Sequence, residues 1–304
     1  MSTAVEEPKP QSKSGQLKST DYKGKIHPDW CPGCGDFSVV AALQMALADL
    51  NLAPYKVAIV SGIGCSSNLP GFMNTYGMHT LHGRSLPVAT GLKLANHELT
   101  VIATGGDGDG FGIGGNHFVH SIRRNIDVTY IVMDNQIYGL TTGQLSPTSR
   151  KGMVTKTSPD GSIENPINPI PMAIACGATY VARGTSGNPK HLANLIKGGI
   201  LHKGFAFIDV FSPCVTYNKV NTKDFFGARV KFLEDAGHNP SDRHAAMDKG
   251  LEWGDTIYCG LFWKQDGVKS LHEQEPILDN GGPLAYRKVG LPQEQGQALI
   301  KELM

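Results

Sequence analysis

A glycine-rich stretch in the middle of the chain carries two acidic side chains. Residues 105–110 have the sequence GGDGDG, with Asp107 and Asp109 inside the run, and Asn135 follows 28 residues after Asp107. Mg²⁺ in phosphate-binding sites is typically held by one or two carboxylates together with neutral oxygens and phosphate oxygens. Asp107 and Asn135 are therefore candidate magnesium ligands, and a phosphorylated cofactor is the ligand that such a site would hold.

The same region matches a second phosphate-binding pattern. Residues 110–115 have the sequence GFGIGG, which fits the G-x-G-x-x-G fingerprint of dinucleotide-binding turns. Asp134, at the end of the next apolar run, supplies the acid that this fingerprint expects. However, Asp107 and Asp109 lie within the turn and would face a pyrophosphate directly unless a cation lay between them. This arrangement of charge favours the magnesium site over the dinucleotide site.

Four of the six cysteines are placed where they could bind one metal centre together. A C-x-x-C pair follows Trp30, and two further thiols follow apolar runs expected to be strands; the four are Cys31, Cys34, Cys65 and Cys214. A thioredoxin-like redox pair, a zinc site and an iron–sulfur site are all open from the residues alone. Zinc ribbons usually repeat the C-x-x-C pair, which this chain does not, and thioredoxin-like pairs follow a strand, whereas this pair precedes the first one. Cys176 and Cys259 have apolar neighbours and are expected in the core.

Secondary-structure patterns predict how these residues are brought together. Short apolar runs rich in β-branched residues predict parallel strands over residues 55–60, 99–104, 128–133 and 205–211. Helical spacing predicts helices over residues 37–50, with Asp36 or Ser38 as the cap, and over 86–95, 114–124, 172–178 and 189–202. This alternation indicates an α/β fold with a doubly wound parallel sheet. Because ligands of such sheets bind at the carboxyl ends of the strands, we expect the acids, the amide and the thiols to gather at one edge.

The composition excludes several classes of protein. The 304 residues carry 28 Lys and Arg against 27 Asp and Glu, so a net charge of +1 gives no reason to expect nucleic acid as a partner. No apolar run approaches the ~20 residues of a membrane span, and the first residues lack the apolar segment of a secretion signal. Six cysteines are too few for a disulfide scaffold in a chain of this length. The sequence therefore predicts a globular cytoplasmic protein with no nucleic-acid or membrane partner.

Three regions are expected along the chain. Residues 1–22 are rich in Pro, Ser, Lys and Glu and are expected to be a flexible tail. Residues 23–222 are expected to form the α/β domain, in which residues 136–170 are a long, irregular and functional loop. Residues 223–304 are expected to be a C-terminal extension, with amphipathic helices over 224–236 and 241–253.

Five motifs, taken in order, resemble those of the β subunits of 2-oxoacid:ferredoxin oxidoreductases. They are WCPGCG from Trp30, GIGCS from Gly62, HTLHGR from His79, GGDGD from Gly105 and NQIYGLTTGQ from Asn135. The sequence GDG followed by an asparagine at this distance resembles the thiamine diphosphate motif. The resemblance covers residues 30–221 and implies a parallel sheet of the thiamine diphosphate-binding type with one [4Fe–4S] cluster.

The resemblance also implies roles for individual residues. The implied cluster ligands are Cys31, Cys34, Cys65 and Cys214, and the implied Mg²⁺ ligands are Asp107, Asn135 and the backbone carbonyl of Ile137. The implied thiamine diphosphate contacts are Ile63, Gly64, Cys65, Ser66, His82, Gly83, Gly108, Asp109, Gly139 and Leu140. For His79 and Arg84 ordinary hydrogen bonding within a loop remains the expectation.

The reaction of this family is the coenzyme A-dependent oxidative decarboxylation of a 2-oxoacid, with electrons passing singly through the cluster to ferredoxin. In the family, the glutamate that activates thiamine diphosphate lies on a separate pyrimidine domain, for which this chain has no room. The resemblance therefore implies no catalytic side chain here and an α subunit as partner, in a heterodimer or a dimer of heterodimers. A ferredoxin-like run of cysteines is absent from the sequence, so a single cluster is expected.

The segments at residues 140–148, 155–159 and 161–164 resemble the 2-oxoglutarate branch of the family more than the pyruvate branch. Lys156 or Arg150 is a candidate to bind a distal carboxylate of the substrate. Arg150 and Lys151 are equally well interpreted as a solvated basic loop or as part of a ferredoxin-docking surface. Two other hypotheses stay open: a non-redox thiamine diphosphate decarboxylase or synthase with structural zinc or free thiols, and a non-catalytic nucleotide- or zinc-binding module.

Overall fold

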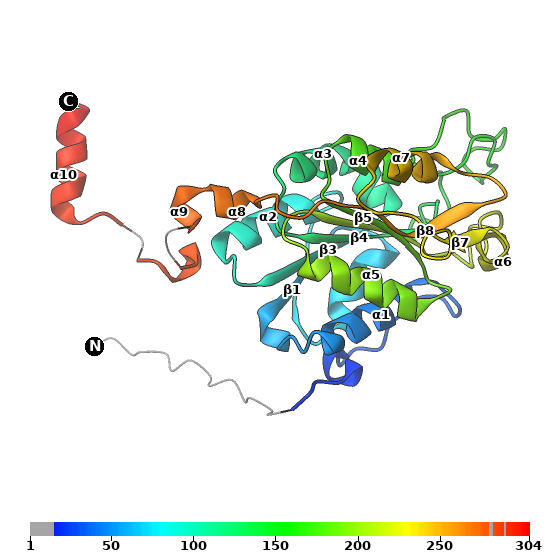
Figure 1. The fold of residues 1–304 in the computed structure, drawn as a ribbon, viewed down its shortest axis with the longest axis horizontal. Coiled ribbons are helices and arrows are strands. Elements are labelled where there is room, and N and C mark those ends of the chain that lie inside the picture. Colours follow the sequence, from blue (N-terminus) through cyan, green and yellow to red (C-terminus); the bar gives the residue numbers. More distant parts are fainter. Residues whose placement is uncertain (1–14, 280–281, 289) are drawn as a thin grey trace.

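The computed structural model describes residues 15–279, 282–288 and 290–304, and within them eight strands form one sheet (Figure 1). The order across the sheet is β2-β1-β3-β4-β6-β5-β8-β7. The first six strands in this order are mutually parallel, whereas β8 runs antiparallel to β5 and parallel to β7. The strands are β1 Val57–Ser61, β2 Tyr76–His79, β3 Thr100–Gly106, β4 Thr129–Asp134, β5 Tyr180–Thr185, β6 Ala206–Phe211, β7 Val230–Phe232 and β8 Ile257–Lys264.

Helices cover both faces of this sheet, which confirms the doubly wound α/β fold (Figure 1). One face carries α1 (Asp36–Asp49) and α5 (Pro189–Leu201). The other face carries α2 (Ser85–Ala95), α3 (Gly115–Arg123), α4 (Pro169–Ala175) and α7 (Arg243–Leu251). Because both faces are covered, every residue of β1, β4 and β6 is buried, and these strands are mostly apolar in the sequence, although β6 contains Asp209.

The helices expected in the α/β part are all present, with ends that differ by at most three residues from the prediction. The expected cap of α1 is wrong. Gly35 occupies the N-cap position, and neither Asp36 nor Ser38 caps the helix. Asp36 is instead the first helical residue, is buried, and accepts a hydrogen bond from the hydroxyl of Ser212. This bond ties the start of α1 to the loop that follows β6.

The helix expected over residues 224–236 is also wrong. The chain forms only α6 (Lys223–Gly227) there and then enters β7, which pairs with β8. Phe226 is buried in a small cluster with Phe211 and Ile257, and Val230 packs against the same cluster. Pairing with β8 and this apolar contact outweigh the local helical spacing. The second helix expected in this region, over residues 241–253, is confirmed as α7.

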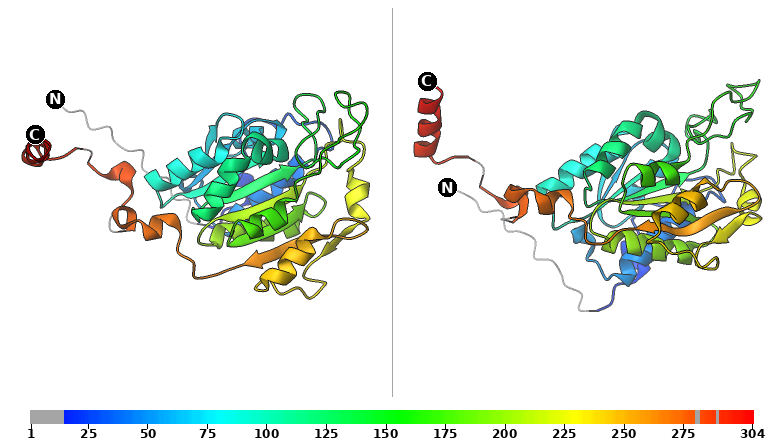
Figure 2. Two further views of the ribbon diagram at one scale, coloured as in Figure 1. Left: turned by 90° about the horizontal axis from the view of Figure 1, so that it is seen from above. Right: turned by 45° about the horizontal axis from the view of Figure 1, so that its top comes forward.

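The region after residue 222 therefore contributes two strands to the main sheet. Beyond β8 the chain continues through α8 (Leu271–Gln274), α9 (Pro276–Asp279) and the 3₁₀ turn η5 (Leu284–Tyr286) to α10 (Gln293–Glu302). Figure 2 shows α10 projecting away from the sheet and its helices in both views. Cys259 is buried in β8 as expected, whereas Cys176 at the end of α4 is only partly buried.

Part of the expected N-terminal tail is packed. Residues 1–14 lie outside the described residues. Ser19–Tyr22 form the 3₁₀ turn η1, in which Tyr22 is buried and donates a hydrogen bond to the carbonyl of Leu47 at 2.9 Å. Residues 19–22 thus belong to the packed structure, in contrast to the expectation of a flexible segment up to residue 22. No helix in the described ranges has both the length and the apolarity needed to cross a bilayer.

Candidate cofactor and cluster site

The predicted convergence of chemical groups at one sheet edge is present. The strands β1, β3, β4 and β6 are parallel neighbours in register, so the segments that leave their carboxyl ends emerge side by side. These segments are the 3₁₀ turn η3 (Cys65–Phe72) after β1, the π-helical turn η4 (Gly108–Ile113) after β3, and the loops after β4 and β6. Single π-helical turns are uncommon and often occur at functional sites.

Asp107 lies at the end of β3 and is only 1% exposed. Its Oδ2 accepts a hydrogen bond from Thr148 Oγ1 at 2.6 Å, and the same hydroxyl lies 3.0 Å from Oδ1 of Asp134, the residue before Asn135. Burial raises the pKa of Asp107 to about 6, and hydrogen bonding to the carboxylate opposes the rise. The two predicted magnesium ligands are therefore neighbours, and a cation beside Asp107 would replace the solvation that burial has removed.

The loop after β4 is held in a fixed shape. Asn135 Oδ1 accepts the backbone N–H of Ile137 at 3.0 Å, and Gln136 has a positive φ of 58°. This left-handed turn orients the backbone around Ile137, which is 2% exposed. The carboxylate of Asp107, the amide oxygen of Asn135 and the carbonyl of Ile137 are hard oxygen donors of the kind that Mg²⁺ prefers.

Tyr138 fixes the approach of this loop to the glycine-rich turn. Its hydroxyl donates to the carbonyl of Gly108 at 3.1 Å, and a Cβ on Gly108 would lie 2.2 Å from the tyrosine ring. Any side chain at this position would therefore push the two loops apart. The need for glycine at position 108 comes from this contact within the chain.

Asp109 connects three of the loops through one oxygen. Its Oδ1 accepts from the backbone N–H of Ile63 at 2.9 Å and of Gly83 at 2.7 Å, and lies 2.9 Å from His82 Nδ1. A Cβ on Gly62 would lie 2.0 Å from Oδ2, which explains why this turn requires glycine. Asp109 was predicted to contact the cofactor, and the structure shows its carboxylate holding the loops that carry Ile63 and His82.

The remaining predicted cofactor contacts lie around this centre. Ser66 is buried, and its Oγ lies 3.2 Å from the position that a Cβ on Gly106 would take. Gly64 has a φ of 123° and is the N-cap of η3. The ring of His82, whose side chain is 38% exposed, lies 6.1 Å from that of Tyr138. These positions leave His82 open to a ligand at the mouth of the site.

The four predicted cluster cysteines line one cavity of about 240 Å³. A Cβ on Gly139 would lie 3.6 Å from the sulfur of Cys65 and 3.7 Å from that of Cys214, so these two sulfurs flank the loop after β4. Asn135, Gly139 and Leu140 line the same cavity. The thiols therefore lie directly beside the loop that carries the predicted magnesium ligands.

The arrangement of these thiols differs from that of a single-ion site. Within the described ranges, no three His, Cys, Asp or Glu side chains are grouped so that they could hold a metal ion. The four thiols surround a space, and all four are free cysteines. Burial and the nearby Asp36 carboxylate raise the pKa of Cys34 above its usual range and that of Cys65 to about 11. A metal centre would have to displace the protons of these thiols on binding.

Several residues that shape the site were not predicted from the sequence. Thr148 donates to Asp107 and also lies 3.0 Å from Asp134 Oδ1, which places the long loop against the end of β4. Trp30 Nε1 donates to the carbonyl of Cys65 at 2.7 Å and joins the C-x-x-C segment to η3. The position of Trp30 directly before the first cysteine could have indicated its role in the sequence. A single threonine within a polar loop, such as Thr148, gives no such indication.

Other predicted residues lie outside the four-cysteine cavity. Arg150 is exposed and lines a separate cavity of about 180 Å³ together with Asp134 and Thr148, and Lys156 is exposed. His79, the last residue of β2, hydrogen-bonds through Nδ1 to the hydroxyl of Ser61 at the end of β1 and to the carbonyl of Ser67 in η3, so its bonds join neighbouring segments and do not stay within one loop as expected.

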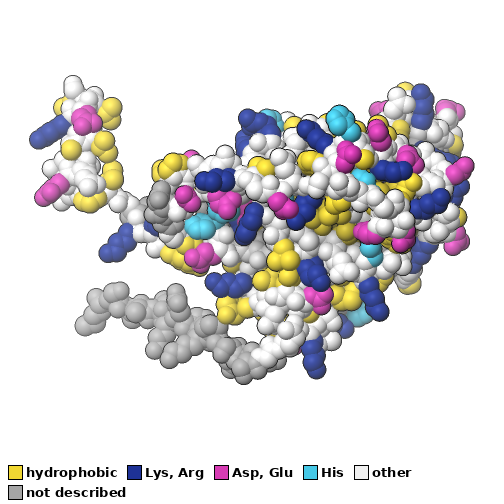
Figure 3. Space-filling model, in the orientation of Figure 1, with side chains coloured by type: hydrophobic (Ala, Val, Ile, Leu, Met, Phe, Trp, Pro, Cys, Tyr) yellow, Lys and Arg dark blue, Asp and Glu magenta, His cyan; other side chains and the backbone are white. Residues whose placement is uncertain are grey.

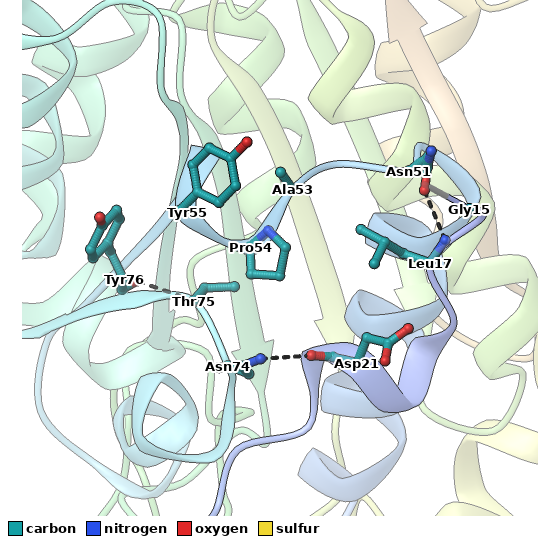
Figure 4. A pocket seen from close by; sticks show the side chains of 10 residues that line it. All are labelled: Gly15, Leu17, Asp21, Asn51, Ala53, Pro54, Tyr55, Asn74, Thr75 and Tyr76. Carbon is teal, nitrogen blue, oxygen red and sulfur yellow. Dashed lines mark hydrogen bonds between the residues drawn. The ribbon is translucent and has the colours of Figure 1, made fainter. Parts of the chain in front are cut away.

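A larger pocket of about 560 Å³ lies at the amino ends of β1 and β2, whereas the predicted site residues follow the carboxyl ends of the strands (Figure 4). It is lined by Gly15, Leu17, Asp21, Asn51, Ala53, Pro54, Tyr55, Asn74, Thr75 and Tyr76. Its hydrogen bonds, from Asn74 Nδ2 to the carbonyl of Asp21 and from the N–H of Leu17 to Asn51, join surface loops. None of the residues predicted to bind a cofactor or a metal lines it.

Comparison with known proteins agrees with this geometry. Residues 62–210 match the family model described as thiamine pyrophosphate enzyme, C-terminal TPP binding domain. Residues 214–280 match the model for the C-terminal part of the pyruvate ferredoxin oxidoreductase beta subunit.

Whole-chain relatives show the same family. The chain is 44% identical over 293 residues to 2-oxoacid:ferredoxin oxidoreductase 1, subunit beta, of Aeropyrum pernix, covering 92% of each chain. It is 48% identical over 249 residues to 2-oxoglutarate synthase subunit KorB of Methanocaldococcus jannaschii, covering 80% of this chain and 91% of the relative. A solved structure of 2-oxoglutarate:ferredoxin oxidoreductase from Magnetococcus marinus, with 2-oxoglutarate, coenzyme A and succinyl-CoA bound, superposes with a TM-score of 0.87 at 44% identity, covering 95% of this chain and 97% of that one. The chain therefore belongs to the β subunits of the 2-oxoacid:ferredoxin oxidoreductases.

Proposed function

We propose that this protein, in the cytoplasm and with an α subunit, catalyses the coenzyme A-dependent oxidative decarboxylation of a 2-oxoacid and passes electrons singly to ferredoxin. The proposed cofactors are thiamine diphosphate, Mg²⁺ and one [4Fe–4S] cluster. One observation carries the proposal: the four-cysteine cavity shares Asn135 and Gly139 with the loop of the predicted magnesium site. An electron acceptor held there would lie beside the cofactor that is to be oxidised.

The proposed role of the chain toward thiamine diphosphate is to anchor and orient it. Asp107, Asn135 and the carbonyl of Ile137 would hold Mg²⁺, with Thr148 fixing the Asp107 carboxylate at 2.6 Å. Asp109 would keep the segments around Ile63 and His82 in place. When bound, thiamine diphosphate supplies the electron sink for decarboxylation, and the cluster supplies a one-electron acceptor.

The donor set at the second centre fits an iron–sulfur cluster. Four thiols from three segments surround a cavity, and Cys₄ ligation is usual for [4Fe–4S] clusters. The N–H of Tyr217 donates to the sulfur of Cys214 at 3.5 Å, a type of bond that tunes the potential of such clusters. The alternative is a non-redox thiamine diphosphate enzyme in which these thiols bind zinc or stay free.

The mouth of the site supports the proposed α partner. Leu81, Ile113 and Leu140 are 74%, 56% and 56% exposed there. The strand β2, which leads into Leu81, is the edge of the sheet, and all four of its residues are exposed. Apolar side chains and an open strand edge grouped at a cofactor site are typical of a surface that a partner covers. We propose a heterodimer or a dimer of heterodimers.

We propose 2-oxoglutarate as the preferred substrate and pyruvate as the next candidate. This choice rests on the resemblance of residues 140–148, 155–159 and 161–164 to the 2-oxoglutarate branch and on the names of the relatives, which include 2-oxoglutarate synthase subunits. Arg150 is the better candidate than Lys156 to bind the distal carboxylate, because it lines a cavity together with Thr148, the residue that holds Asp107.

The test is an activity assay of the complex after anaerobic coexpression with an α subunit. We expect reduction of methyl viologen that requires both a 2-oxoacid and coenzyme A, with 2-oxoglutarate giving the highest kcat/KM. Release of CO₂ without viologen reduction would instead support the non-redox alternative. Viologen reduction with pyruvate but not with 2-oxoglutarate would leave the reaction intact and refute the substrate choice.

A further inference from the structure

A groove of about 580 Å³ lies between α5 and β8, and none of the residues predicted to bind a cofactor or a metal lines it. The helix contributes Leu195, Gly198 and Leu201 to its lining, and the strands β5 and β8 contribute Tyr180 and Leu261. The Tyr180 hydroxyl donates to the carbonyl of Leu195 at 2.8 Å, and a Cβ on Gly198 would lie 2.5 Å from this hydroxyl, so glycine lets the ring approach the helix. Figure 3 shows the face on which α5 lies, where hydrophobic side chains lie among Lys, Arg, Asp and Glu side chains. The groove therefore offers an apolar lining to a ligand.

One end of the groove carries a buried histidine with an unused ring nitrogen. His202 is 5% exposed, and its Nε2 lies 2.7 Å from Thr179 Oγ1. Thr179 donates its only proton to Asn125 Oδ1 at 2.9 Å, so the threonine oxygen accepts the N–H of His202 Nε2. The other ring nitrogen, Nδ1, has no hydrogen-bond partner among the described residues. Because buried polar atoms are normally hydrogen-bonded, Nδ1 is a candidate to bind a ligand.

A carboxylate of the chain itself lies near this nitrogen without bonding to it. Asp266 Oδ1 is 4.0 Å from His202 Nδ1 and 3.0 Å from Lys264 Nζ, and all three residues line the groove. The side chains of Asp266 and Lys264 are 73% and 37% exposed, so theirs is a surface ion pair, which contributes little stability and opens easily. Asp266 thus marks where a carboxylate lies at this end of the groove. A ligand carboxylate placed slightly deeper would bond to His202 and Lys264 together.

The charges at this end of the groove favour an anion. Two cations, Lys264 and the exposed Lys203, line it together with one acid, Asp266. Burial lowers the pKa of His202 most and Lys264 lowers it further, whereas Asp266 and Asp127 oppose this. An anion bound at Nδ1 would raise the pKa of His202, so binding would take up a proton at this nitrogen.

We propose that this groove binds an amphiphilic monocarboxylate, such as a medium-chain fatty acid, with its carboxylate between His202 and Lys264 and its apolar chain along Leu195 and Leu201. The carboxylate of the ligand would displace that of Asp266 from Lys264. His202 lies just before β6, at the amino ends of the strands, whereas the cofactor site follows their carboxyl ends. The proposal therefore does not depend on the proposed function.

The test is titration calorimetry of the anaerobically purified complex with octanoate and with octanamide, which share an apolar chain and differ in the charge of the head group. Lys264→Gln removes a cation from the groove, and Asp266→Asn removes the competing carboxylate. The matched control is Lys269→Gln, which changes an exposed lysine after β8 that does not line the groove. A thermal melt of each variant without ligand shows whether it is folded.

We expect octanamide to bind the wild-type complex roughly tenfold more weakly than octanoate, because hydrogen bonds to a charged group are the stronger ones. Lys264→Gln should weaken octanoate binding roughly tenfold, since one such bond is lost. Asp266→Asn should strengthen it roughly threefold, because the competing surface ion pair is gone. Lys269→Gln should behave as the wild type. The affinity for octanoate should rise as the pH falls from about 8 to about 6, with proton uptake measurable as a heat that depends on the buffer.

Three results would overturn the proposal. Equal binding of octanoate and octanamide would refute the assignment of a carboxylate to this end of the groove. Octanoate binding that is unchanged in both Lys264→Gln and Asp266→Asn would place the ligand elsewhere on the complex. Absence of octanoate binding to the wild-type complex would refute the site itself. None of these results bears on the proposed function, which is tested separately by viologen reduction.

Discussion

Replacing Thr148 by valine tests how the loop after β4 is coupled to the proposed magnesium site. The change removes the hydroxyl and keeps the shape of the side chain. Thr148 is 4% exposed, and its Oγ1 lies 2.6 Å from Asp107 Oδ2 and 3.0 Å from Asp134 Oδ1. A hydroxyl has one proton to donate, and the shorter distance assigns that proton to Asp107.

The expected loss follows from this geometry. A hydrogen bond to a charged group contributes about 1.5–3 kcal/mol, and removing a partner that orients a metal ligand typically lowers metal affinity 10–100-fold. We therefore expect Thr148→Val to weaken binding of Mg²⁺ with thiamine diphosphate roughly 30-fold, which corresponds to about 2 kcal/mol. Thr148→Ser keeps the hydroxyl and should stay within about threefold of the wild type.

The assay is a titration of the apo complex with thiamine diphosphate at fixed Mg²⁺, followed by the change in tryptophan fluorescence. A parallel thermal melt of the apo complex shows whether the variant is folded. If Thr148→Val bound the cofactor as tightly as the wild type while remaining folded, the contact to Asp107 would have no bearing on the site and our assignment would be refuted.

Three further predictions concern stability and assembly. Arg183 and Asp209 form a fully buried ion pair at 2.8 Å, so Arg183→Met should lower the free energy of unfolding by about 3–5 kcal/mol. The double variant Arg183→Met/Asp209→Leu should recover most of this loss, because no unpaired charge is left buried. An unchanged denaturation midpoint in the single variant would contradict the prediction. Burial lowers the pKa of His202, so the unfolded state binds a proton more readily than the folded state does. The free energy of unfolding should therefore fall as the pH drops below about 6.5. A His202→Gln variant with the same pH dependence as the wild type would refute this role. Leu81→Glu should reduce copurification with the α subunit. Leu201→Glu makes the same change at a leucine that is 63% exposed at the end of α5, and this control should not reduce copurification.

The parts of the fold that the sequence predicted are those in which local pattern and burial agree. The runs that form β1, β3, β4 and β6 are apolar on both faces because helices cover both sides. The strand β5 was missed because its apolar run is only three residues long before Arg183, Gly184 and Thr185, whereas β6 has apolar residues on both sides of Asp209. Arg183 is tolerated in the sheet because Asp209 lies opposite it on β6. The strand β7 was taken for helix because its pairing with β8 depends on residues far along the chain.

The candidate site, like the fold, has a part that the sequence predicted and a part that it did not. Residue type and position after a strand predicted where Asp107, Asn135 and the cysteines would meet, since parallel strands end at one edge. The same reasoning did not predict that Asp109 would bond to the backbones of Ile63 and Gly83, because a sequence does not show which oxygen faces the ligand. It also gave no signal for Thr148, whose role depends on how a long loop folds back onto β3 and β4.

The most direct test of the central claim is the iron content and visible absorption of the anaerobically purified complex, measured for the wild type and for two cysteine variants. We expect about four irons per β chain with a broad visible band in the wild type and in Cys176→Ser, because Cys176 lies outside the cavity. Cys65→Ser should lose most of the iron and the band. One zinc per chain, or iron that is unaffected by Cys65→Ser, would contradict the account.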